Sequence, residues 1–98
     1  MEQYDVIKSH VAEVVKDYNV SQDELKKIHD VMDEVRSTLR EKGKYSPAEF
    51  ERKIKGAMKG NRNEQYIDYH FVKEMARAFM EDDRWAEVYP ALYGDKSE

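Results

Sequence analysis

The feature that most constrains this chain is the spacing of its apolar residues, which recur every three or four positions. Two series show this spacing: Tyr4, Ile7, Val11, Val14 and Tyr18, and then Leu25, Ile28, Met32, Val35 and Leu39. Such spacing places each series on one face of a helix, whereas a strand requires strict alternation, which we do not find. We therefore predict amphipathic helices over residues 3–18 and 21–42.

Two copies of a Ser-x-x-Glu sequence mark where helices begin. They are Ser21-Gln22-Asp23-Glu24 and Ser46-Pro47-Ala48-Glu49. The serine accepts a hydrogen bond from the amide three residues on, and the glutamate side chain reaches back to the serine amide. Proline is favoured at the first helical position. We predict that the second copy begins a helix over 47–59, in which Gly56 costs about 1 kcal/mol relative to alanine. A glycine at this position would allow another helix to approach closely.

Residues 63–81 carry two adjacent apolar stripes. One stripe is Ile67, Phe71, Met75 and Ala78, and the other is Val72, Ala76 and Phe79. An apolar arc this wide predicts a helix that contacts more than one neighbour, capped by Asn61 or Asn63. We then expect a short helix over 83–89, capped by Asp82 or Asp83 and ended by Pro90.

These elements predict an all-α fold, an antiparallel four-helix bundle with a short C-terminal fifth helix or turn. At 98 residues, the chain has room for a single core, so residues 1–98 are expected to form one domain. Absence of cysteine suits a reducing compartment. The acidic start, Met1 to Asp5, lacks the apolar region of a signal peptide, and no run is long enough to cross a bilayer. We therefore predict a cytoplasmic protein.

Residues that would carry catalysis or bind a metal are not arranged in any known motif. His10, His29 and His70 each precede an acidic residue by one helical turn, but a di-iron bundle needs a Glu-x-x-His sequence, which is absent. Pairs on the helix surface explain the spacing more simply. No phosphate-binding loop or nucleophile motif occurs. We predict no enzyme activity, no metal and no cofactor.

A basic stretch favours nucleic acid as one alternative partner. Residues 44–62 hold six cations and two carboxylates, although the whole chain has a net charge of −4. Four of these cations share one predicted helix face: Arg52, Lys55, Lys59 and Arg62. A recognition helix needs several basic side chains on one exposed face, so this face is a candidate site for nucleic acid.

The C-terminal aromatics are the candidate site for a protein partner. Trp85, Tyr89 and Tyr93 are large side chains of the kind that dominate interface energetics, although they also suit a cover over the end of the bundle. The final sequence Tyr93-Gly94-Asp95-Lys96-Ser97 resembles the C-terminal signature of immunity proteins for pediocin-like bacteriocins of the enterocin A type. The order of the predicted helices is similar across most of the chain.

This resemblance implies a cytosolic four-helix bundle whose C-terminal segment sets specificity, with Asp95 and Lys96 among its contacts. It implies self-protection of a toxin-producing bacterium, by binding a toxin-bound sugar-transporter receptor from its cytosolic side. We therefore predict a non-enzymatic protein–protein interaction module, monomeric or homodimeric, with bacteriocin immunity as the leading hypothesis. The alternative is a small nucleic-acid-binding or regulatory protein, including one of phage origin, that uses the basic face.

Overall fold

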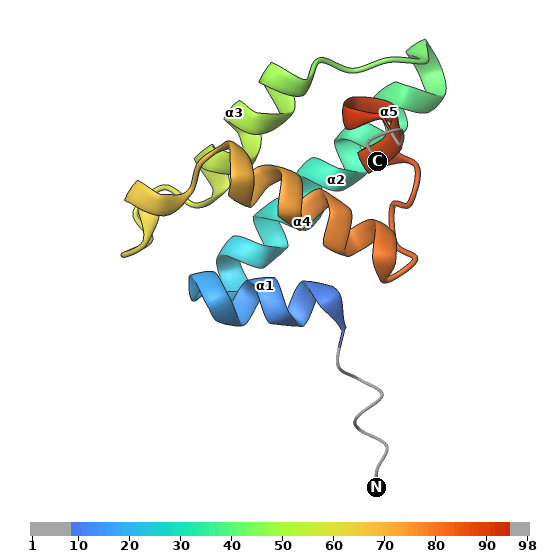
Figure 1. Cartoon of the computed structure of the whole chain (residues 1–98). Coiled ribbons are helices and arrows are strands. Elements are labelled where there is room, and N and C mark those ends of the chain that lie inside the picture. Colours follow the sequence, from blue (N-terminus) through green and yellow to red (C-terminus); the bar gives the residue numbers. More distant parts are fainter. Residues whose placement is uncertain (1–8, 95–98) are drawn as a thin grey trace, which may run out of the picture.

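The computed structural model describes residues 9–94, in which five α-helices and one short 3-10 helix follow one another without a strand. They are α1 (His10–Tyr18), α2 (Gln22–Lys42), α3 (Pro47–Ala57), η2 (Glu64–Tyr66), α4 (Tyr69–Glu81) and α5 (Val88–Tyr93) (Figure 1). The predicted all-α class is confirmed. Within this part of the chain, no helix is both long and apolar enough to cross a membrane.

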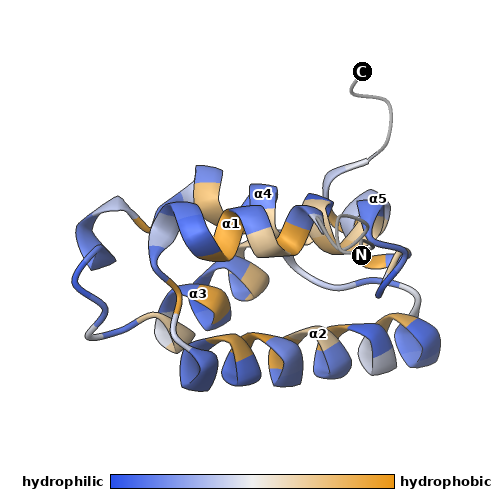
Figure 2. Ribbon diagram, turned by 90° about the horizontal axis from the view of Figure 1, so that it is seen from below, coloured by the Kyte–Doolittle hydropathy of each residue, from blue (hydrophilic) through white to orange (hydrophobic). Residues whose placement is uncertain are grey.

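The longest helix, α2, forms one side of the molecule. Figure 2 shows its apolar residues along the edge that faces the other helices and its hydrophilic residues on the outer side. α4 lies in the opposite layer and crosses α2 in the view of Figure 1. It packs against α1, α3 and α5, whereas α2 packs against α3 and α5. α4 is therefore the central element of the fold.

The core is built from the stripes that the apolar spacing predicts. Fully buried side chains come from α2, α3, α4 and α5, and include Ile28, Met32, Val35, Phe50, Ile54, Phe71, Met75, Phe79 and Val88. Both predicted stripes of α4 are buried, because this helix has neighbours on several sides.

Two helix starts follow the predicted capping chemistry to different degrees. At α2 the full capping box forms: the Glu24 amide donates to Ser21 Oγ at 3.1 Å, and the Ser21 amide donates to Glu24 Oε1 at 2.8 Å. At α3 only half forms, with the Glu49 amide donating to Ser46 Oγ at 3.2 Å. α3 ends at Ala57, so the predicted helix over 47–59 is too long by its last two residues.

The first helix begins later than predicted. Ser9 is extended and caps α1 by accepting from the Ala12 amide at 2.9 Å. The described helix therefore starts at His10 rather than within a continuous helix over 3–18, and residues 3–8 lie outside the described part. A serine in an extended conformation marks the start of a helix. Its side chain accepts the hydrogen bond of a first-turn amide, which a carbonyl of a preceding helical turn would otherwise accept.

The predicted cap of the fourth helix is wrong. Asp68, not Asn61 or Asn63, caps α4, accepting from the His70 and Phe71 amides at 3.0 and 3.3 Å. The predicted helix over 63–81 is therefore shorter, and residues 64–66 form η2 instead. The two asparagines bond the end of α1: Asn61 Nδ2 donates to the Asn19 carbonyl, and Asn63 Nδ2 donates to the Tyr18 carbonyl.

The fifth helix is also displaced, because it spans Val88–Tyr93 rather than 83–89. Pro90 lies in its first turn, where the missing amide has no intrahelical acceptor to lose, so proline does not end the helix. Neither aspartate before it acts as its cap. Asp82 instead accepts from the His10 and Val11 amides at 2.8 and 3.0 Å, and so completes the cap of α1 from 71 positions further along the chain.

Candidate functional site

Trp85, the first of the predicted interface aromatics, is turned toward the rest of the molecule. Its indole nitrogen donates to Asp33 Oδ1 at 2.9 Å. Its ring lies 5.0 Å from that of Phe79, edge to face, and 5.3 Å from that of His29. Arg84 and Arg36 lie over its faces at 5.0 and 5.9 Å. These contacts join the segment before α5 to α2 and α4.

The backbone at Trp85 adopts an unusual conformation to make these contacts. Its φ is +48°, in the left-handed region, which costs a residue with a bulky side chain about 1 kcal/mol. The hydrogen bond to Asp33 and the ring contacts with Phe79 and His29 offset that cost. Trp85 therefore acts as a cover of the core in this structure, one of the two roles that the sequence left open.

The other two aromatics differ from each other in exposure. Tyr89 is buried, with 9% of its surface exposed, whereas Tyr93 is half-buried. Their rings lie 5.5 Å apart. Burial, with smaller contributions from Glu51, Tyr69 and Tyr89, raises the pKa of Tyr93 to about 12. The predicted tail contacts Asp95 and Lys96 lie outside the described residues.

Tyr93 contributes to a surface that the sequence did not predict, which we call the tyrosine–lysine surface (Tyr69, Lys73 and Tyr93). Tyr69 is 47% exposed, although it is a large aromatic on the central helix. Lys73 Nζ donates to Tyr69 Oη at 3.2 Å and lies over both tyrosine rings, 5.4 Å from Tyr69 and 5.8 Å from Tyr93. The ammonium group therefore lies beside both tyrosine rings.

A shallow hollow of about 390 Å³ adjoins this surface. It is lined by His70, Lys73, Glu74, Arg77 and Tyr89. Four of these lie at helical spacing on α4, so they share one side of that helix, while Tyr89 comes from α5. The hollow thus brings together cations and an aromatic ring from two elements.

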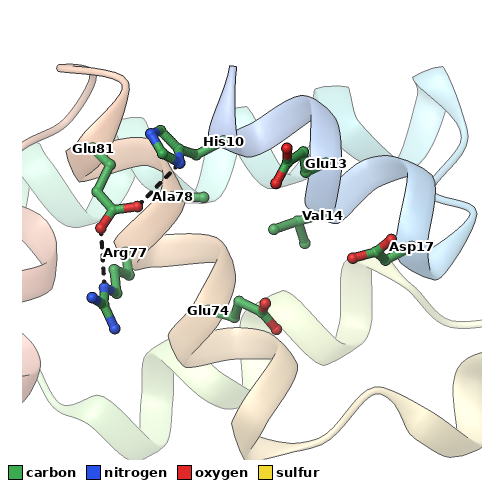
Figure 3. A pocket seen from close by; sticks show the side chains of 8 residues that line it. All are labelled: His10, Glu13, Val14, Asp17, Glu74, Arg77, Ala78 and Glu81. Carbon is green, nitrogen blue, oxygen red and sulfur yellow. Dashed lines mark hydrogen bonds and ion pairs between the residues drawn. The ribbon is translucent and has the colours of Figure 1, made fainter. Parts of the chain in front are cut away.

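An acidic groove of about 200 Å³ lies between α4 and α1 and shares Glu74 and Arg77 with the hollow (Figure 3). Its carboxylates are Glu13, Asp17, Glu74 and Glu81. Glu81 pairs with Arg77 at 3.2 Å and with His10 at 3.3 Å, and in Figure 3 both partners point toward it. Within residues 9–94, no group of three or more such side chains is arranged to hold a metal ion.

The histidines do not form the predicted pairs with acids one turn away. His10 pairs with Glu81 of α4. His29 packs against the rings of Phe79 and Trp85, at 5.6 and 5.3 Å, and burial followed by the nearby Arg84 lowers its pKa. For His10 and His29, contacts with another element therefore replace the local pairs, whereas His70 is exposed.

The predicted basic face is only partly a helix face. Arg52 pairs with Glu49 at 2.7 Å, and Lys55 pairs with Glu51 at 3.7 Å. Lys59 and Arg62 lie beyond the end of α3 at Ala57, where they are exposed. Among the described ion pairs, none includes either of them. The four cations therefore do not extend along one helix.

The apolar spacing of the sequence does not identify Tyr69 as part of a site. Tyr69 lies two positions after Ile67 and two before Phe71, on neither stripe of the fourth helix. An aromatic residue outside the apolar stripes, with lysine four positions later, is the signal that would have identified this surface.

Comparison with known proteins gives no match, neither to a protein-family model, nor to a curated protein, nor to a solved structure.

Proposed function

We propose that this chain is a non-enzymatic protein-binding module that contacts its partner through the tyrosine–lysine surface. The observation that supports this proposal is the exposure of Tyr69 beside Lys73 and Tyr93. Tyrosine is enriched among the residues that dominate binding energy, because it buries a large rigid area and still offers a hydroxyl group. The ring is already held in place by Lys73, so little side-chain freedom is lost on binding.

Bacteriocin immunity is the specific form of this proposal. The support is the resemblance of Tyr93-Gly94-Asp95-Lys96-Ser97 to the immunity-protein signature, together with the place of Tyr93 in the exposed surface. The partner would be a toxin-bound receptor, met from the cytoplasmic side, and the protein would act as a monomer or homodimer. The antiparallel four-helix bundle belongs to the same proposal; the packing of α4 against both α1 and α3 is compatible with it.

The test is expression in a bacteriocin-sensitive strain that is challenged with a panel of pediocin-like toxins. Tyr69→Ala is the variant that tests the surface specifically, because Tyr69 is exposed and its removal leaves the core intact. We expect the wild-type chain to protect, and Tyr69→Ala to reduce protection at least about tenfold, the effect of losing one strong interface residue. Tyr66→Ala is the matched control, since Tyr66 is 60% exposed and outside this surface. Failure to protect against every toxin would exclude bacteriocin immunity.

Nucleic-acid binding is the second candidate, and the exposed cations Lys59 and Arg62 favour it. Phosphate contacts make such binding strongly dependent on salt. The test is a gel-shift experiment with mixed-sequence DNA at low and at high salt. Lys59→Glu/Arg62→Glu should abolish the shift, whereas Arg52→Glu should weaken it less, because Arg52 is already paired with Glu49. No shift at low salt removes this candidate.

A further inference from the structure

Lys73 differs from the other half-buried cations of the molecule. Of the lysine and arginine residues between positions 9 and 94, three are half-buried: Arg36, Lys53 and Lys73. Arg36 pairs with Asp33 at 3.2 Å, and Lys53 pairs with Glu34 and Glu49. Lys73 pairs with no described carboxylate; two tyrosine rings and one hydroxyl group are its neighbours.

An ammonium group beside aromatic rings is stabilised further by a carboxylate, whose negative charge the rings replace only in part. Its hydrogen-bonding capacity is also incompletely used: the ammonium group has three donors, and the hydroxyl group of Tyr69 accepts one. The hollow opens next to this group, with Arg77 and His70 on its lining. A carboxylate entering the hollow would therefore meet a cation that already has a fixed position.

We propose that the hollow beside Lys73 binds a carboxylate side chain from an acidic segment of a partner protein. Charge complementarity identifies this occupant: the carboxylate pairs with Lys73, while the exposed ring of Tyr69 packs against the residue next to it. Arg77 contributes less, because Glu81 already holds it at 3.2 Å. The proposal rests on the proposed function, since it names the chemistry of the partner at the same surface.

Glu74 should affect the binding of a carboxylate in the opposite direction to Lys73. It lines the hollow together with Lys73 and is exposed, so it repels an incoming carboxylate. Removal of Lys73 should weaken the binding of an acidic segment, and removal of Glu74 should strengthen it. A merely structural role for either residue would not produce this pair of opposite effects.

The experiment follows the amide signals of the isotope-labelled full chain by NMR during titration with a short blocked peptide of alternating glutamate and alanine. A peptide with glutamine in place of glutamate is the reference probe. We expect saturable shifts at His70, Lys73 and Arg77 with the acidic peptide alone, and weaker binding as salt screens the charges. Lys73→Gln should weaken binding about fivefold, the effect of about 1 kcal/mol, whereas Glu74→Gln should strengthen it.

Lys26→Gln is the matched control, because Lys26 is an exposed lysine on α2, and it should leave binding unchanged. The proposal is overturned if both peptides shift the same signals equally, if neither does, or if Lys26→Gln weakens binding as much as Lys73→Gln. These outcomes are separate from the protection assay. A chain that protects the cell but does not bind the acidic peptide would support bacteriocin immunity and contradict the proposed carboxylate site. A chain that binds the peptide but does not protect would support the carboxylate site and contradict bacteriocin immunity.

Discussion

At the scale of single residues, the structure separates glycines that look alike in the sequence. Gly56 lies inside α3 with ordinary backbone angles, and a Cβ atom added there would meet no other atom within 4 Å. The close helix approach that the sequence suggested is therefore wrong. Gly43 caps α2 with a φ of +78°, where any side chain is strained.

This difference predicts opposite effects of the same substitution. Gly56→Ala should raise the free energy of unfolding by about 0.5–1 kcal/mol, because alanine restricts the unfolded chain and favours the helix. Gly43→Ala should lower it by about 1 kcal/mol, because left-handed geometry is unfavourable for alanine. Urea denaturation measures both values. Destabilisation by Gly56→Ala would mean that α3 has a close neighbour on that side.

At the scale of the elements, α1 is held at both ends by distant parts of the chain. Ser9 and Asp82 satisfy the amides of its first turn, whereas Asn61 and Asn63 bond the carbonyls at its other end. A helix of 9 residues is too short to be stable alone in water. These tertiary bonds, together with the burial of its apolar face, therefore determine whether α1 forms.

Asp82 makes this dependence testable. Asp82→Asn should cost about 1–2 kcal/mol at neutral pH, because asparagine keeps only one of the two accepting oxygens and loses the negative charge, and hydrogen exchange should accelerate most in α1. Burial alone would raise the pKa of Asp82, but the amides of Val11 and His10 outweigh it and hold the pKa below its usual value of 3.8. The contribution of Asp82 is therefore full above the usual value and is lost as the pH falls through the lower folded-state value.

The matched control for Asp82 is its neighbour. Asp83 is exposed, has a φ of +64° that asparagine tolerates, and accepts no described hydrogen bond. Asp83→Asn should leave stability within about 0.5 kcal/mol. Equal losses in the two variants, or a difference between wild type and Asp82→Asn that persists unchanged in strong acid, would contradict the capping role.

At the scale of the whole molecule, the contacts of Trp85 stabilise the fold, because they connect the segment before α5 to α2 and α4. Trp85→Ala should lower the free energy of unfolding by about 3 kcal/mol, the loss expected for a large packed aromatic. Trp85→Phe should lose about 1 kcal/mol, since the bond to Asp33 is removed while much of the ring packing stays. Thermal denaturation monitored by circular dichroism tests both. Unchanged stability in Trp85→Ala would return Trp85 to the candidates for a partner interface.

The sequence by itself determined the helical class, the buried stripes of α2 and α4, and the capping box at Ser21. These follow from local rules: apolar spacing selects a helix face, and a serine with a glutamate three residues later satisfies nearby amides. Tertiary structure decided what local rules do not contain. Asp82 caps a helix far away in the sequence, Pro90 falls inside α5, and Trp85 turns inward while Tyr69 remains exposed. For Asp82 and Trp85 the deciding contacts are with residues from other elements, so local rules along the chain do not include their energy.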